Sequence, residues 1–178
     1  MYLYIVKRRN IKILLLFFAI ILFGFSCKKK EQYPPEPIIG FVSFTNIQNS
    51  TGIDYKGILK ISFTDGDGDI GLRQEDTIYP FERSGKYYYD FFIKYYEKQK
   101  GIYKEIIIDS NLTFNARLPY LEPNVDNPNI KGEIEIELFI NNPISVYDTI
   151  KFEAAICDRL LNMSNTISTP DIIVKKHN

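Results

Sequence analysis

The feature that most constrains the fold is an alternation of apolar and polar residues with a period of two. In the stretch GEIEIELFI, the even positions of 134–140 carry isoleucine or leucine, while positions 133, 135 and 137 carry glutamate. Residues 59–63 and 150–156 alternate in the same way. Successive side chains of a β-strand point to opposite faces, so this period predicts strands with one buried face. No window shows a convincing helical period, and the sequence therefore predicts an all-β protein.

Segments of this kind recur along the chain, separated by clusters of Gly, Pro, Asn and Asp. Their number and spacing predict an antiparallel, immunoglobulin-like β-sandwich of about seven strands. The segment EKQKG is predicted to be a hairpin connection between two of them. The expected strands are 38–47, 59–63, 87–96, 102–109, 134–140, 150–156 and 166–174.

The N-terminal segment has the pattern of a secretory signal. Four basic residues lie within positions 7–12, and an apolar run of 13 residues extends from Ile13 to Phe25. A membrane-spanning helix needs about 20 apolar residues, so the run is short for a span. The residues Gly-Phe-Ser that precede Cys27 resemble a bacterial lipobox, in which the cysteine is lipidated and becomes the mature N-terminus. A retained transmembrane anchor is the alternative.

We therefore predict three parts in the chain. Residues 1–26 are a lipoprotein signal peptide, residues 27–37 are the lipidated Cys27 and a proline-rich tether, and residues 38–178 form the sandwich domain. Removal of the signal leaves 152 residues, a length that suits one domain. The mature chain keeps 18 Lys and Arg against 22 Asp and Glu, a net charge of −4. A mildly acidic chain without a basic stripe argues against nucleic-acid binding.

Two segments carry a family resemblance. FTDGDGDIGL at 63–72 and DRLLNMSNTISTPDI at 158–172 resemble paired motifs of a group of Bacteroidota-type outer-membrane lipoproteins of unknown function, and residues 87–105 resemble the central hairpin of that group. The resemblance implies location and fold rather than an activity. The lysines at 28–30 depart from the acidic stretch that resembles a surface-export signal in such lipoproteins. The side of the outer membrane therefore stays open between periplasmic and surface-facing.

The stretch DGDGD at 65–69 places three aspartates at alternate positions. Calcium takes six to eight oxygen ligands, and aspartates on alternate residues of a tight loop can direct several carboxylates to one point. The loop is not an EF-hand, because position six is Ile70 instead of glycine and position twelve is Asp76 instead of glutamate. We predict a structural Ca²⁺ site of another geometry with Asp65, Asp67 and Asp69 as core ligands. An Asp-Gly turn without an ion is the alternative.

Two further aspartates are predicted to be able to close this site. Asp76 follows a few residues later on the same loop. In an immunoglobulin-like order, the loop after the second strand and the loop between the last two strands emerge at the same end, so Asp158 is expected to face the aspartate run. The alternative for Asp158 is a cap on its own turn, because polar residues, including Asn162, follow it.

A tyrosine-rich segment, YYYDFFIKYY, is predicted to present rings on both faces of a strand. Tyr88, Phe92 and Tyr96 fall on one face, with Asp90 and Lys94 between them. Such a face could bind an envelope protein or a glycan. The alternative is that a neighbouring loop covers these rings.

Few residues in the sequence support catalysis. The only histidine is His177, next to the last residue, and Cys157 stands alone at the end of an apolar run once Cys27 is lipidated, as is typical of a small buried side chain. We therefore predict a lipid-anchored, non-catalytic binding or scaffolding module of the cell envelope, attached to the membrane through its lipid. The alternative is a carboxylate-based hydrolase of envelope glycans, which would need two acids about 5–9.5 Å apart across a cleft.

Overall fold

The computed structural model describes residues 31–108, 113–122, 124 and 126–176. The predicted signal peptide, Cys27 and His177 lie outside these residues. All the strands belong to one compact unit, Gln32–Asn178. Because this unit contains the hydrophobic core as well as the strands, we expect it to fold by itself.

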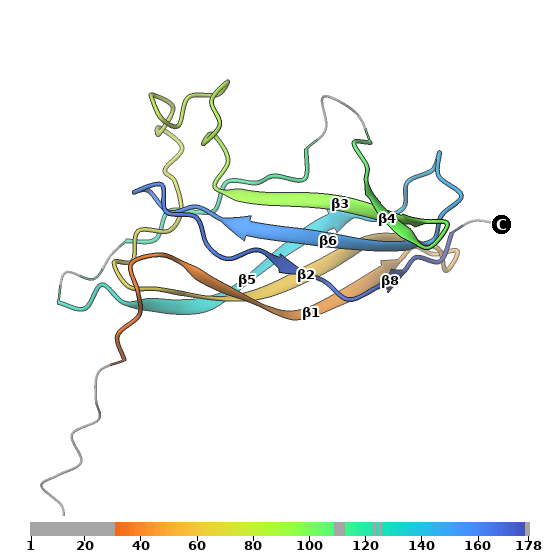
Figure 1. The fold of residues 1–178 in the computed structure, drawn as a ribbon, viewed down its shortest axis with the longest axis horizontal. Coiled ribbons are helices and arrows are strands. Elements are labelled where there is room, and N and C mark those ends of the chain that lie inside the picture. The colour runs from red at the N-terminus through yellow and green to blue at the C-terminus, as the bar shows by residue number, and fades with distance from the viewer. Residues whose placement is uncertain (1–30, 109–112, 123, 125, 177–178) are drawn as a thin grey trace, which may run out of the picture. The chain divides into compact units, whose positions relative to one another are not determined.

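Two antiparallel sheets pack face to face, as Figure 1 shows. The first sheet has the strand order β1-β2-β5, and the second has the order β4-β3-β6-β7 with β8 also paired to β6. The strands of the first sheet are β1 (Ile38–Gln48), β2 (Asp54–Asp65) and β5 (Ile130–Phe139). Those of the second are β3 (Phe91–Gln99), β4 (Ile102–Glu105), β6 (Thr149–Ile156), β7 (Ile167–Ser168) and β8 (Ile172–Ile173).

This arrangement confirms the predicted immunoglobulin-like sandwich. The chain passes from β2 in the first sheet to β3 in the second and returns with β5, so the two sheets interleave along the sequence. The last expected strand, 166–174, is divided into β7 and β8 because Pro170 between them has no N–H to give to the ladder. The expected strand 87–96 begins only at Phe91, and the expected strand 102–109 ends at Glu105.

The period of two produces the core as predicted. Leu59 and Ile61 of β2 and Phe152 of β6 are fully buried between the sheets, and the ring of Tyr95 of β3 packs at a tilt against that of Phe152 with ring centroids 5.5 Å apart. On the outer face of the first sheet, lysines of β2 pair with glutamates of β5. The EKQKG segment forms the predicted hairpin, in which Lys100 and Gly101 both have positive φ, as a tight type I′ turn requires.

The loops at one end of the sandwich matter for the site. β2 ends where the chain leaves for β3, and β6 ends at the same end of the molecule (Figure 1). The aspartate run therefore lies beside the segment that follows β6, as the predicted strand order requires. The described end of the tether also reaches this point, since the N–H of Gly66 donates to the carbonyl of Pro34 over 2.8 Å.

Candidate metal centre

Three backbone and side-chain contacts hold the loop after β2 against the end of β6. Ile70 and Asp158 form an isolated antiparallel bridge. The N–H of Arg159 donates to the carbonyl of Asp69 over 3.2 Å, and the N–H of Leu160 donates to Oδ2 of Asp69 over 3.1 Å. Because β2 and β6 belong to different sheets, these contacts connect the two layers of the sandwich.

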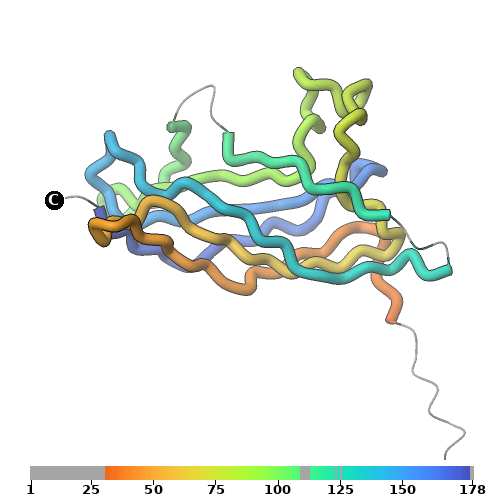
Figure 2. Tube along the Cα trace, turned by 180° about the vertical axis from the view of Figure 1, so that it is seen from behind, coloured from red at the N-terminus to blue at the C-terminus, as the bar shows by residue number. Residues whose placement is uncertain are grey.

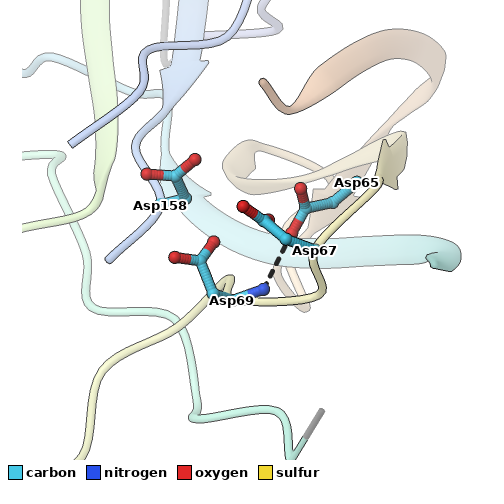
Figure 3. Close-up of side chains that lie close together, drawn as sticks. All are labelled: Asp65, Asp67, Asp69 and Asp158. Carbon is cyan, nitrogen blue, oxygen red and sulfur yellow. Dashed lines mark hydrogen bonds between the residues drawn. The ribbon is translucent and has the colours of Figure 1, made fainter. Parts of the chain in front are cut away.

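Four aspartates converge at this junction (Figure 3). Asp65, Asp67, Asp69 and Asp158 each offer one carboxylate oxygen, and these oxygens all lie within 4.8 Å of one another. Asp65 and Asp158 are almost completely buried, at 0% and 1% exposure, and Asp69 is also buried. We call these four residues the aspartate cluster.

Hydrogen bonds satisfy only part of the cluster. Oδ2 of Asp65 accepts from the N–H of Asp69 over 3.0 Å, a bond drawn in Figure 3. The Oδ1 atoms of Asp65, Asp67 and Asp69 are buried and have no hydrogen-bond partner. A buried polar atom without a partner is rare and costs roughly 1–3 kcal/mol, more when it is charged. Three such atoms in one cluster make an arrangement that could hold a metal ion.

The position of Asp158 is compatible with both of its predicted roles. Its Oδ1 accepts from the N–H of Asn162 over 2.7 Å, and its Oδ2 accepts from the side-chain amide of Asn162 over 2.9 Å. The residue therefore caps its own turn. A carboxylate oxygen has two lone pairs, so these bonds leave Asp158 able to face the other three carboxylates.

The electrostatics of the cluster reflect its burial and its like charges. Burial, together with the neighbouring charge of Asp67, raises the pKa of Asp65 to about 7. Burial and the charge of Asp158 raise the pKa of Asp69 to about 6. Burial also raises the pKa of Asp158. Without a cation, the cluster thus resists full ionisation at neutral pH.

A buried carboxylate at the opposite end of the sandwich behaves differently. Glu97 is as buried as Asp158, but its two oxygens accept hydrogen bonds from Tyr95, Asn142, Ser145 and Gln99. Burial alone would raise the pKa of Glu97, yet these bonds lower it below its ordinary value. Side chains of the protein therefore donate hydrogen bonds to both carboxylate oxygens of Glu97. In the aspartate cluster, by contrast, three buried carboxylate oxygens have no hydrogen-bond donor.

Two glycines let the loop after β2 approach the backbone of neighbouring segments closely. Gly68 and Gly71 both have positive φ, 70° and 88°. A Cβ at Gly68 would lie 2.3 Å from the carbonyl oxygen of Pro128, and one at Gly71 would lie 2.1 Å from that of Pro119. A side chain at either position would collide with backbone, so the loop needs glycine there for space as well as for conformation.

The structure does not bring Asp76 to the cluster. Its Oδ2 accepts a hydrogen bond from the N–H of Arg73 over 2.8 Å, which caps a turn of the same loop. Four carboxylates are grouped by the structure, and Asp76 is not among them. The chain turns away after Gly71 because Leu72 is buried and its N–H donates to the carbonyl of Leu118.

Arg159, which lies beside the cluster, was not predicted as a site residue from the sequence. Its guanidinium donates to the carbonyls of Ile70 and Gly71 over 3.1 and 2.9 Å and stacks on the ring of Tyr120. Its positive charge lowers the pKa of Asp69 and so offsets part of the rise. The one sequence signal for a charge beside the cluster was that Arg159 directly follows Asp158.

The predicted aromatic surface is not a continuous face. Tyr88 precedes β3, so the strand does not carry it on the same face as Phe92 and Tyr96. The carbonyl of Tyr88 accepts from Arg117, whose guanidinium also lies over the Tyr88 ring. The hydroxyl of Tyr96 donates to Glu153 over 2.9 Å. All three residues are half-buried, and the partner surface and its covered alternative both stay predictions.

Comparison of the chain with protein-family models, with curated proteins and with solved structures found no match. Within the described part of the chain, no helix is long and apolar enough to cross a membrane.

The thiol of Cys157 is buried, and burial raises its pKa to about 12, which suits an unreactive core side chain. The geometry of the described residues shows that the aspartate cluster could hold a metal ion.

Without a bound cation, the free energy of unfolding should fall as pH rises from about 4 to about 7. The folded-state pKa values of Asp65 and Asp69, about 7 and about 6, lie above the ordinary 3.8, so in this window the folded protein keeps protons that the unfolded chain has released. Urea denaturation in EDTA at pH 5 and pH 8 should show a decrease on the order of 1–3 kcal/mol.

The variant Asp65→Asn is the control for this pH effect. It should reduce the decrease without abolishing it, because Asp90 lies outside the cluster and burial raises its pKa to about 6. Equal stability of the unsubstituted protein at pH 5 and pH 8 would contradict the electrostatic account of the cluster.

Proposed function

We propose that this chain is a lipid-anchored, non-catalytic binding or scaffolding module of the cell envelope that holds one structural Ca²⁺ in the aspartate cluster. The observation that carries the proposal is the set of three buried, unpartnered oxygens on Asp65, Asp67 and Asp69, next to the buried Asp158. A divalent cation would give all of these oxygens a partner and would screen their mutual repulsion.

The ligand chemistry favours calcium over other common ions. All four candidate ligands are carboxylates, and zinc prefers sites that include histidine or cysteine. Magnesium demands a near-octahedral shell and keeps several waters, whereas calcium accepts flexible geometry and bidentate carboxylates. Calcium outside the cytoplasm is abundant enough to fill extracellular-type sites with a Kd of about 10⁻⁴–10⁻³ M.

A structural role fits the position of the ion better than a catalytic role. The cluster joins the loop after β2 to the segment after β6, so an ion there would connect the two sheets at one end of the sandwich. In a glycan hydrolase, two acids with opposed pKa values face each other across an open cleft. The acids of the cluster instead converge on one buried point, which suits an ion and not a sugar ring.

The envelope location is supported by the N-terminal sequence. The basic segment, the short apolar run and Cys27 together resemble a lipoprotein signal. Two or three acyl chains on Cys27 would hold the protein at the membrane almost permanently. The prolines between Cys27 and β1 would then act as a spacer between membrane and sandwich.

Calcium should raise the thermal stability of the unit Gln32–Asn178. An ion that binds only the folded state stabilises it by about 1.4 kcal/mol when its concentration is roughly tenfold above Kd, or roughly 3–8 °C in melting temperature. Calorimetry in millimolar CaCl₂ and in EDTA, at matched ionic strength, measures this difference. Magnesium should have a smaller effect.

Two matched variants separate site binding from general effects of calcium. Asp67→Asn should reduce the calcium shift, because Asp67 belongs to the cluster, whereas Asp76→Asn should keep the whole shift, because Asp76 lies outside it. If the melting curves in calcium and EDTA coincide for the unsubstituted protein, the aspartate run is a turn and the calcium proposal fails.

The anchor is tested separately in cells. Serine has no thiol to accept the lipid, so Cys27→Ser should accumulate as an unprocessed precursor that is retained with its signal peptide. Gel mobility and membrane fractionation of the two forms measure this. A variant that is processed and fractionates like the parent would overturn the lipid anchor.

A further inference from the structure

In the described part of the chain, the outer edge of β5 in the first sheet has no paired strand. In the order β1-β2-β5, the strand β5 pairs with β2 on one side, and no described strand pairs with its other side. In an antiparallel ladder, every second residue directs its N–H and C=O away from its partner strand. The free side of β5 is therefore a row of backbone donors and acceptors onto which another strand can add.

A groove beside this edge is lined by residues of β5 and of the segment 113–122. Figure 2 shows the course of the chain through these two segments. It consists of two cavities of about 750 and 480 Å³. Both are lined by Ala116 and Ile136, so the two cavities adjoin and together make a groove along β5. We call it the β5 groove.

The β5 groove opens onto the hydrophobic core. Phe63, Ile70 and Phe91, all buried core residues, lie on its wall. Ile134 and Ile136 face inward on β5 but remain only half-buried, whereas their register partners on β2, Ile61 and Leu59, are 0% exposed. The inward side chains of β5 are thus less buried than the inward side chains of β2.

The glutamates on the outer face of β5 indicate which charge a strand added at this edge should carry. Glu133, Glu135 and Glu137 point outward from β5, with side chains that are 53–55% exposed. On the paired side of β5, Lys56 and Lys60 of β2 form ion pairs with this glutamate row. A strand on the free side would place its own outward side chains beside the same glutamates, where like charges are unfavourable and opposite charges are favourable.

A second copy of this chain does not meet that requirement. If two copies joined through β5, the glutamate row of one would lie beside the glutamate row of the other. A partner strand with outward lysine or arginine would instead repeat the pattern that β2 already provides. Its inward residues, at the alternate positions, would be apolar and would enter the groove.

We propose that the β5 groove binds an extended segment of a partner protein, with apolar and basic residues in alternation, which adds to β5 as a further strand. Main-chain hydrogen bonds to β5 provide the attachment, and the apolar side chains fill the space over Ile134 and Ile136. This inference rests on the proposed binding role and names the class of partner for it.

A synthetic peptide tests the inference on the unit Gln32–Asn178. The probe is a fluorescently labelled nine-residue peptide that alternates lysine with valine or isoleucine, and the readout is fluorescence anisotropy in millimolar CaCl₂. We expect saturable binding at one peptide per protein, at least tenfold tighter than for a peptide of the same composition without the alternation. Equal binding of the two peptides would reduce the effect to charge attraction and overturn the proposal.

N-methylation shows whether the peptide binds as a strand. In a strand, the lysine N–H groups point to one edge and the apolar-residue N–H groups point to the other. Because only one edge can pair with β5, methylating one of these two sets should weaken binding at least tenfold, and methylating the other should leave it within about threefold. Equal effects of the two methylated peptides would overturn strand addition.

Two protein variants locate the binding site. Glu133→Lys combined with Glu135→Lys should reverse the preference, so that a peptide alternating glutamate with valine binds better than the lysine peptide. Ala116→Leu places a larger side chain where the two cavities meet and should weaken binding at least tenfold. Tight binding that survives both variants would place the peptide elsewhere and refute the proposal.

The outcomes also separate this inference from the proposed function. If calcium stabilises the same sample while the alternating peptide does not bind, the calcium-binding module stands and the groove proposal fails. If the peptide binds as described without any calcium effect, the groove proposal stands and the structural ion is wrong.

Discussion

The main physical constraint at one end of the sandwich is the repulsion among four closely grouped carboxylates. Asp65, Asp67, Asp69 and Asp158 bring their oxygens within 4.8 Å of one another, and three of those residues keep a buried oxygen without a partner. Such an arrangement is unfavourable for the bare protein, since burial and like charge both oppose ionisation. The nearby charge of Arg159 offsets only part of this cost. A bound divalent cation would turn the same arrangement into a connection between the sheets.

The site and the groove share elements of the fold. Ile70, which follows the cluster residue Asp69, lies on the wall of the β5 groove, and Ile130 at the start of β5 pairs with Asp65. The loop that carries the aspartates is wedged against Pro128 and Pro119, which flank the segment leading into β5. An ion in the cluster would therefore also fix the position of one end of the groove. The proposed ion site and the proposed strand-binding groove would then lie next to each other at this end of β5.

Much of the fold was predictable because strand burial is a local, periodic property. The alternation at 134–140 marks β5, and the alternation at 150–156 marks β6. The meeting of Asp158 with the aspartate run was predictable only through the assumed strand order. The turn that removes Asp76 depends on the burial of Leu72, and the groove depends on which strand lies at a sheet edge. Neither has a periodic signal, so neither could be predicted from the sequence.

The most direct test of the central claim is a crystal structure of the unit Gln32–Asn178 grown in millimolar CaCl₂, with anomalous diffraction to identify the ion. The account predicts one calcium at about 2.3–2.6 Å from carboxylate oxygens of Asp65, Asp67, Asp69 and Asp158. Its remaining ligands would be oxygens of water or of backbone carbonyls. A well-ordered cluster under these conditions that contains only water, with no anomalous peak, would contradict the account.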